Sequence, residues 1–134
     1  LGRGPSFPIA EEAALKFKET CAQHAEAYST AEVMHGPLAL VTPGFPVLVM
    51  ASRDASEETV AEAADLLVDK GAAVFATTRR AGKAERLPFA ATAHPLTDPL
   101  ALIASFYMFV EAFARRRGLD PDRPPNLRKV TQTL

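Results

Sequence analysis

Charged side chains recur at helical spacing near the start of the chain. Glu12, Lys16 and Glu19 follow one another on successive turns of a predicted helix, and Gln23 continues the same narrow stripe. In a cleft, a lysine and a glutamate close together could hold a second carboxylate ionised and aimed as a general base. On an exposed face the same spacing forms only an ion-pair ladder, worth about 0.2–0.5 kcal/mol per pair. Spacing alone leaves both interpretations open.

A glycine-containing loop precedes this helix. Gly2 and Gly4 permit backbone angles that other residues avoid, and the loop leads through Ser6 into the helix N-terminus. Backbone N–H groups and the helix dipole favour an anion at such a place, which makes Gly4 and Ser6 candidate binding residues. The loop lacks a complete Walker or dinucleotide fingerprint, so a simple tight turn is the alternative interpretation.

One histidine stands out by its position. His35 lies in Met34-His35-Gly36-Pro37, just before a predicted turn, and the near-neutral pKa of imidazole suits proton transfer. The alternative is a solvated or structural histidine, and His24 and His94 have no stronger claim. No metal-ligand spacing occurs among His, Cys, Asp and Glu, so we expect no metal site. Cys21 falls on the apolar face of the first helix, where it is expected to fill the core.

The C-terminal residues 120–134 are predicted to form an irregular tail, because they contain several prolines. Lys129 lies within this tail. An ordered tail would deliver the Lys129 ammonium to a sugar or a phosphate, whereas a mobile tail would leave it in solvent.

Alternating helices and short apolar strands must position these residues. Ser29 and Glu32 form a capping-box pattern that predicts a short helix, which Gly36 and Pro37 would end. Strand–helix alternation with buried strands predicts an α/β layer fold with a parallel sheet. The other expected elements are helices over 8–23, 57–70 and 98–117, buried strands over 47–51 and 72–77, and a weaker strand over 87–92.

Two of these helices carry apolar faces that need partners. The face of the first helix that runs from Ile9 to Cys21 is expected to pack on the sheet. The helix over 98–117 is apolar nearly all round, so part of it should meet another subunit or domain.

The composition of the 134 residues is that of one ordinary domain. Fifteen basic and sixteen acidic residues nearly cancel, so no broad electrostatic footprint for nucleic acid or an anionic membrane is present. A single cysteine favours a reducing compartment, the cytoplasm. No stretch is expected to span a bilayer, and no secretory signal is visible. The chain begins Leu-Gly without Met, so we expect a fragment whose first strand is truncated.

Several segments together carry a family resemblance. They resemble the second sugar-isomerase (SIS) domain of glutamine–fructose-6-phosphate amidotransferase, and the likeness reaches both ends of the chain. The segments are Gly2-Arg3-Gly4 through Pro8-Ile9-Ala10, Glu12 with Ala14-Leu15-Lys16 and Lys18-Glu19, His24-Ala25-Glu26-Ala27-Tyr28, Glu32 with His35-Gly36-Pro37-Leu38-Ala39-Leu40, and Asn126-Leu127-Arg128-Lys129-Val130-Thr131.

The resemblance implies a flavodoxin-like, three-layer fold with a five-stranded parallel sheet. In that family two SIS domains in tandem form an isomerase unit that dimerises and acts on phosphosugars without a cofactor. Glu19 matches the glutamate that moves a proton between C1 and C2 of the sugar. His35 matches the histidine that opens the sugar ring in the neighbouring subunit's site, and Lys129 matches the tail lysine that meets the open-chain sugar. Glu12 and Lys16 match charged residues that support Glu19.

Departures from the family pattern leave several functions open. The chain has no N-terminal cysteine for glutamine hydrolysis, and the family's phosphate-binding Ser/Thr loop belongs to the first SIS domain, so this chain alone should bind substrate poorly. The resemblance extends to glucosamine-6-phosphate deaminases and other phosphosugar isomerases. A phosphosugar-sensing domain of a regulator and a purely structural dimerisation domain are the alternatives. The presence of Glu19, His35 and Lys129 together favours an enzyme.

Overall fold

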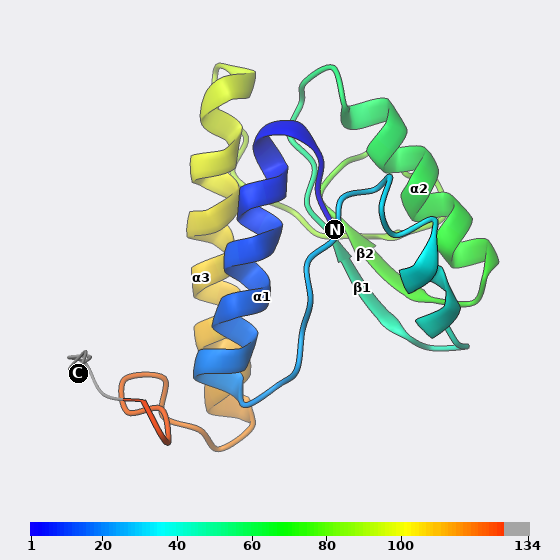
Figure 1. The fold of residues 1–134 in the computed structure, drawn as a ribbon. Helices are drawn as coiled ribbons and strands as arrows, with labels where there is room; N and C mark the ends of the chain where they lie inside the picture. The colour runs from blue at the N-terminus through cyan, green and yellow to red at the C-terminus, as the bar shows by residue number, and fades with distance from the viewer. Residues whose placement is uncertain (128–134) are drawn as a thin grey trace, which may run out of the picture.

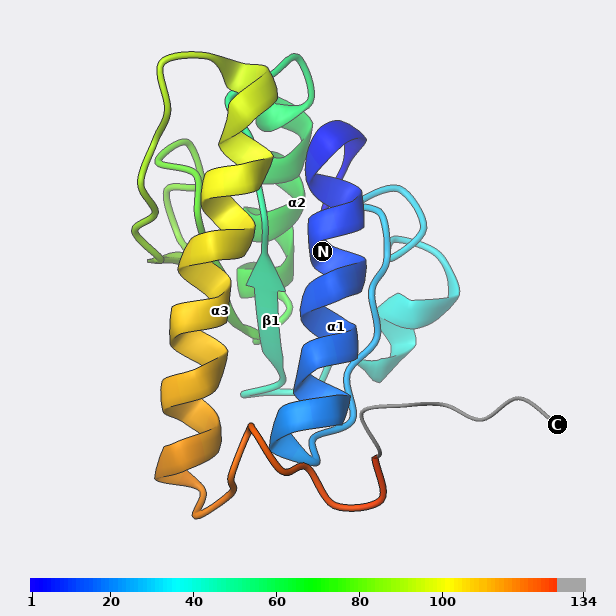
Figure 2. The ribbon, with the colours of Figure 1, turned by 90° about the vertical axis from the view of Figure 1, so that its left-hand side faces the viewer.

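The structure, a computed structural model, describes residues 1–127, and these form three layers. A parallel sheet lies in the middle, with helices α1 (Phe7–Cys21) and α3 (Asp98–Arg116) on one face and helix α2 (Glu57–Asp69) on the other (Figure 1). Seen from the side in Figure 2, α1 and α3 run next to each other in front of the sheet. This arrangement confirms the predicted α/β layers.

The assigned sheet has three parallel strands in the order β1-β2-β3. They are β1 (Pro46–Val49), β2 (Ala73–Ala76) and β3 (Glu85–Arg86). Val47 of β1 lies opposite Val74 of β2, and Phe75 of β2 lies opposite Glu85 of β3. The first two strands are short apolar runs, as expected for strands that are covered on both faces.

The first two residues lie beside β1 as an additional strand position. The Leu1 amino group donates to the Leu48 carbonyl, and the Met50 N–H donates to the Leu1 carbonyl at 2.8 Å. On its other side, Gly2 forms a parallel bridge to the segment 28–30. The described residues therefore have three assigned strands rather than the expected five, with isolated backbone bonds at two further positions.

Two apolar clusters fill the spaces between the layers. One lies between the sheet and α2 and contains Val49, Val60 and Leu67, each fully buried. The other brings α1 against α3 and the end of β1, through residues such as Cys21 and Phe106. The apolar face of α1 therefore packs on α3 as well as beside β1, whereas the sequence pattern predicted packing on the sheet alone.

Helix α3 overturns the expectation that no stretch is long and apolar enough to span a bilayer. Within residues 1–127, α3 with the three residues before it, Pro95–Arg116, meets that description by length and composition alone: it has 22 residues, and an 18-residue window in it has a mean hydropathy of 1.4. Its inner face packs against α1 through Phe106 and Val110. Its outer face leaves Leu100 and Met108 68% and 77% exposed, so apolar surface does continue around the helix as expected.

The segment after α1 differs from the expected short helix. Ser29 and Glu32 do form the capping box, but residues 30–35 form hydrogen-bonded turns instead of a helix. Gly36 and Pro37 then begin the 3-10 helix η2 (Gly36–Leu40) rather than ending a helix. Proline suits a first helical turn because its missing N–H has no partner there.

The predicted strand over 87–92 is wrong. The third strand lies two residues earlier, at Glu85–Arg86, where no apolar run marks it. The Leu87 N–H still donates to the Ala76 carbonyl at 2.8 Å, but Pro88 has no N–H with which to continue the ladder. The chain then runs through an irregular segment to the 3-10 turn η3 (Pro95–Thr97) and α3.

Candidate functional site

The predicted stripe on α1 forms one connected ion-pair network. Lys16 Nζ lies 2.6 Å from Glu19 Oε2 and 3.5 Å from Glu12 Oε1. All three side chains are about one-third exposed, at 28–32%. The hydrogen bond to Glu19 is the main reason that the pKa of Lys16 is raised, so the ammonium stays charged. The helix brings these groups together because they are three and four residues apart.

Two further partners, which the sequence pattern did not indicate, come from α3 and from the residue that follows it. The Tyr107 hydroxyl donates to Glu12 Oε1 at 2.8 Å, and Arg117 Nη1 donates to Gln23 Oε1 at 2.7 Å. The bond to Glu12, followed by desolvation, raises the pKa of Tyr107. The sequence does show polar residues at one edge of the apolar helix α3, which could have indicated a polar contact there. Which residues they pair with depends on how α3 lies against α1. The stripe therefore lies along the α1–α3 seam.

An aromatic cluster fixes this seam. The Phe17 ring of α1 meets three rings of α3 edge-on, with centroid distances of 5.5 Å to Phe106, 5.8 Å to Phe113 and 6.3 Å to Phe109. Edge-to-face pairs of this kind contribute about 0.5–1.5 kcal/mol beyond their buried area. Arg117 adds a cation–π contact, 5.6 Å from the centre of the Phe113 ring. The polar stripe consequently lies beside a well-packed helix pair.

The loop before α1 is held by its own contacts. A Cβ on Gly2 would lie 2.5 Å from the Ser6 carbonyl oxygen, so only glycine fits there. Gly4 adopts φ +55°, a left-handed angle that glycine tolerates best. The buried Ser6 hydroxyl donates to the Arg3 carbonyl at 2.9 Å and accepts from the Arg3 N–H at 3.2 Å. Ser6 thus closes the loop, and an anion-binding role for Gly4 and Ser6 stays a prediction.

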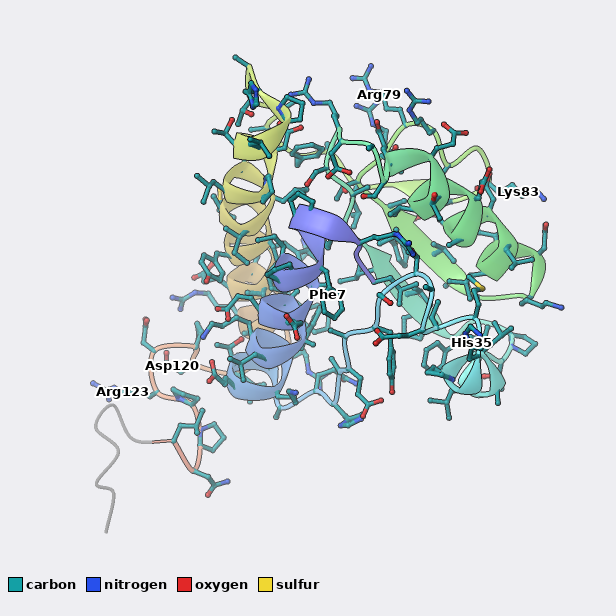
Figure 3. The ribbon with its side chains drawn as sticks, turned by 45° about the horizontal axis from the view of Figure 1, so that its top comes forward. Phe7, His35, Arg79, Lys83, Asp120 and Arg123 are labelled. Carbon is teal, nitrogen blue, oxygen red and sulfur yellow. The ribbon has the colours of Figure 1, made fainter. Side chains whose placement is uncertain are left out.

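His35 lies at an open cavity of about 520 Å³ on the other side of α1 from α3 (Figure 3). Its Nδ1 lies 2.9 Å from the Ala31 carbonyl oxygen. A carbonyl only accepts, so Nδ1 carries the proton and Nε2 of the neutral ring keeps a free lone pair. The cavity is lined by Phe7, Ala27, Tyr28, Glu32, His35, Gly36 and Pro37.

The turn that carries His35 is fixed by the capping box. The Ser29 N–H donates to Glu32 Oε2 at 2.9 Å, and the Glu32 N–H donates to Ser29 Oγ at 3.1 Å. These bonds lower the pKa of Glu32, the backbone bond from Ser29 contributing most. Next to them, the Tyr28 hydroxyl donates to Glu26, which raises the pKa of Tyr28. The Ala31 carbonyl that orients His35 lies inside this turn.

The predicted residues thus form two separate groups. Glu12, Lys16 and Glu19 are joined directly, whereas nothing in residues 1–127 joins them to His35 by a hydrogen bond or an ion pair. Lys129 lies outside the described residues. Within one chain, the ion-pair network therefore lies along the contact between α1 and α3, whereas the oriented His35 imidazole lies at the cavity on the other side of α1.

A buried carboxylate at the start of α3 was also missed. Asp98, the first residue of α3, is fully buried and paired with Arg53. Arg53 Nε and Nη2 donate to its two oxygens at 2.7 and 2.9 Å, and the Thr92 N–H and hydroxyl add bonds at 3.0 and 2.8 Å. The Arg53 guanidinium is the main cause that holds the pKa of this carboxyl well below its usual range. The pair ties the loop after β1 to α3.

The side chains of Cys21 and His94 make contacts that stabilise the fold. Cys21 is fully buried, and its Sγ donates to the Val110 carbonyl at 3.6 Å. His94 Nδ1 accepts from the Leu96 N–H at 3.2 Å and so caps the turn before α3. Over residues 1–127, no three His, Cys, Asp or Glu side chains are grouped so that they could hold a metal ion.

Comparison with known proteins gives a consistent result. The family model of the SIS domain matches residues 1–114. Glutamine–fructose-6-phosphate aminotransferase (isomerizing) from Pyrobaculum aerophilum is 36% identical over 134 residues, covering 97% of this chain and 22% of the relative. The chain therefore spans about a fifth of the length of the curated relatives that it matches.

Two solved structures have the same fold at higher and lower sequence identity. A proposed phosphosugar isomerase from Silicibacter pomeroyi superposes with a TM-score of 0.85 and 59% identity, over 90% of this chain and 37% of its own. The C-terminal domain of glucosamine–fructose-6-phosphate aminotransferase from Francisella tularensis superposes with a TM-score of 0.79 and 28% identity, over 89% of this chain and 35% of its own.

Proposed function

Because this chain belongs to the SIS domain family, we propose that it is the catalytic SIS domain of an enzyme that interconverts ketose and aldose forms of an amino-sugar phosphate. The substrates would be fructose-6-phosphate and glucosamine-6-phosphate, with ammonia released or transferred. The proposal draws on the names of the relatives, of which this chain spans only a part.

The connected network of Glu12, Lys16 and Glu19 is the observation that carries this proposal. Aldose–ketose exchange needs a carboxylate beside the C1 and C2 protons, and it needs that carboxylate held in one position. The Lys16 ammonium, 2.6 Å from Glu19 Oε2, fixes the position of the Glu19 carboxylate. Glu19 would take the proton from one carbon and return it to the other, and preorganised donors would stabilise the enediol-like charge that develops in between.

His35 is proposed to open and close the sugar ring. Its free Nε2 lone pair can accept a proton from a sugar hydroxyl, while the protonated ring can return a proton to the ring oxygen. Because Glu19 and His35 do not meet within one chain, the two would act together only in a site built from two chains. This separation supports a dimer with shared sites, as the resemblance implies.

We propose that two further parts of the protein complete the site. A preceding SIS domain would supply the phosphate-binding loop, and Lys129 would reach the open-chain sugar. Five sheet positions are supported by the backbone bonds of Leu1 and Gly2 on both sides of that segment. We place the enzyme in the cytoplasm, with a phosphosugar as its ligand and without direct contact to nucleic acid or membrane.

The first experiment uses the natural full-length protein with fructose-6-phosphate and with glucosamine-6-phosphate. Each is tested with and without glutamine or ammonia. Ammonia release from glucosamine-6-phosphate would identify a deaminase, glutamine-dependent product an amidotransferase, and interconversion without nitrogen transfer a simple isomerase. No turnover under any condition would refute the enzyme and favour a phosphosugar sensor.

The second experiment tests the shared site. Glu19→Gln and His35→Ala should each remove exchange of the C2 proton with solvent while leaving phosphosugar binding largely intact. Mixed dimers of the two variants should regain part of the activity, because one of their two sites would then have both residues intact. Failure to regain any activity in verified mixed dimers would contradict a site built from two chains.

A further inference from the structure

We propose that Tyr107 of α3 is a positioning residue that holds the Glu19 carboxylate in place through two intervening side chains on α1. Those side chains are Glu12 and Lys16. The inference rests on the isomerase function proposed above, and it adds to that site a residue from a different helix, far from the others in sequence.

The basis is an unbroken line of contacts across the seam. The Tyr107 hydroxyl donates to Glu12 Oε1 at 2.8 Å. The same Glu12 oxygen lies 3.5 Å from Lys16 Nζ. Lys16 Nζ in turn lies 2.6 Å from Glu19 Oε2. The network therefore begins on α3 and ends at the proposed catalytic carboxylate.

The unequal distances around Lys16 explain what the hydroxyl does. The Lys16 ammonium could pair with either neighbouring carboxylate, yet it lies closer to Glu19 than to Glu12. The phenol hydrogen bond draws negative charge from the Glu12 carboxylate and holds it toward α3, so Glu12 attracts the ammonium less strongly than Glu19 does. Loss of the hydroxyl would free Glu12 to compete for the ammonium, and the Glu19 side chain would then lose its fixed rotamer.

The position of Tyr107 separates this role from a contribution to folding. The residue is 43% exposed, and exposed polar pairs contribute little to stability. Replacement by phenylalanine keeps the ring and removes only the hydroxyl. A loss of turnover without a loss of stability would therefore come from the position of the catalytic group.

The test compares Tyr107→Phe with wild type in the natural full-length protein. We expect kcat for isomerisation to fall about tenfold while KM stays within about twofold, because a misplaced catalytic group slows the chemical step more than it weakens binding. Ser105→Ala is the matched control, because it removes a hydroxyl hydrogen bond of 2.8 Å, to the Ala101 carbonyl, on the same helix. The control should keep wild-type kcat.

A double-mutant cycle then asks whether the hydroxyl acts through Glu12. If it does, adding Tyr107→Phe to Glu12→Met should change kcat by less than twofold, since methionine offers the hydroxyl no acceptor oxygen and the contact is already lost. Fully additive effects, an unchanged kcat in Tyr107→Phe, or an equal loss in Ser105→Ala would each overturn the proposal.

A titration that needs no activity keeps this inference distinct from the proposed function. The difference in tyrosinate absorbance between the protein and its Tyr107→Phe counterpart isolates Tyr107. We expect a pKa above the ordinary value of 10.0, and a return toward that value in Glu12→Met, which removes the acceptor. No effect of Glu12→Met on the pKa of Tyr107 would overturn the contact itself. No turnover in wild type with the titration shift intact would leave the contact standing and overturn the isomerase function together with this role for Tyr107.

Discussion

Arg53 and Asp98, 45 residues apart in sequence, form a two-pronged ion pair in which the carboxylate is fully buried and the guanidinium is partly exposed. The pair joins the loop after β1 to the first turn of α3. The N–H and hydroxyl of Thr92 also donate to this carboxylate, so Asp98 Oδ1 accepts from both residues. The position of α3, and hence of Tyr107, depends on this contact.

Asp98→Asn should lower the free energy of unfolding by about 2–3 kcal/mol. Asparagine keeps the shape of the side chain but removes the charge and replaces an acceptor oxygen with a donor that faces Arg53, and breaking a buried pair leaves the partner uncompensated. Urea unfolding followed by circular dichroism measures the change. Lys83→Met, which breaks the exposed pair with Asp69, is the control and should cost less than about 1 kcal/mol. A loss for Asp98→Asn no larger than that of the control would contradict the role assigned to the pair.

The same carboxylate predicts how stability depends on pH. The pKa of Asp98 in the folded chain lies below its ordinary value of 3.8, so the folded state favours the ionised form. Its contribution is complete above about pH 5 and is lost as the pH falls through 4 and below. Unfolding free energies measured at several pH values between 7 and 3 should therefore decline less steeply in Asp98→Asn than in wild type. Equal slopes for the two proteins would contradict this prediction.

Local sequence patterns predicted most of the fold. Helices α1, α2 and α3 and strands β1 and β2 lie within a few residues of their expected positions, because apolar periodicity and proline or glycine boundaries mark them. The predicted position of β3 was wrong because Glu85 and Arg86 form no apolar run and pair with a neighbouring strand, β2, on one edge only. Its position depends on where β2 offers free backbone groups, which no local pattern encodes.

Part of the geometry of the candidate site was also predictable from the sequence. The spacing of Glu12, Lys16 and Glu19 along one helix follows from helical geometry, and the structure confirms that they meet. Tyr107 and Arg53 could not be identified, because their partners belong to other elements and depend on the crossing of α1 and α3 or on the end of β1. Side-chain partners across elements are tertiary information that periodicity does not carry.

Gly2→Ala should strongly destabilise the chain. A Cβ at this position would lie 2.5 Å from the Ser6 carbonyl oxygen and 2.9 Å from Phe7 Cα, both of them backbone atoms that cannot move aside cheaply. We expect a loss of at least about 2 kcal/mol, since overpacking of rigid neighbours costs about 1–3 kcal/mol. Gly82→Ala is the control, because its nearest new contact, a side-chain oxygen of Asp65, lies at 3.8 Å. Thermal unfolding would show a lower Tm for Gly2→Ala alone, and equal Tm values would argue against the close approach.

The contact between His35 Nδ1 and the Ala31 carbonyl predicts which nitrogen of the neutral imidazole carries the proton. The Ala31 carbonyl accepts from Nδ1, so the neutral ring should be protonated at Nδ1, whereas an unconstrained histidine prefers the proton on Nε2. Glu32→Ala removes the acceptor of the Ser29 N–H and so opens the capping box that shapes this turn, and it should shift His35 toward the unconstrained preference. Long-range ¹H–¹⁵N NMR spectra distinguish the two tautomers directly. Glu26→Gln, which alters a carboxylate outside the 29–35 turn, should leave the His35 signals unchanged. A wild-type ring protonated mainly at Nε2 would remove the basis for assigning Nε2 as the atom that accepts a proton from the sugar.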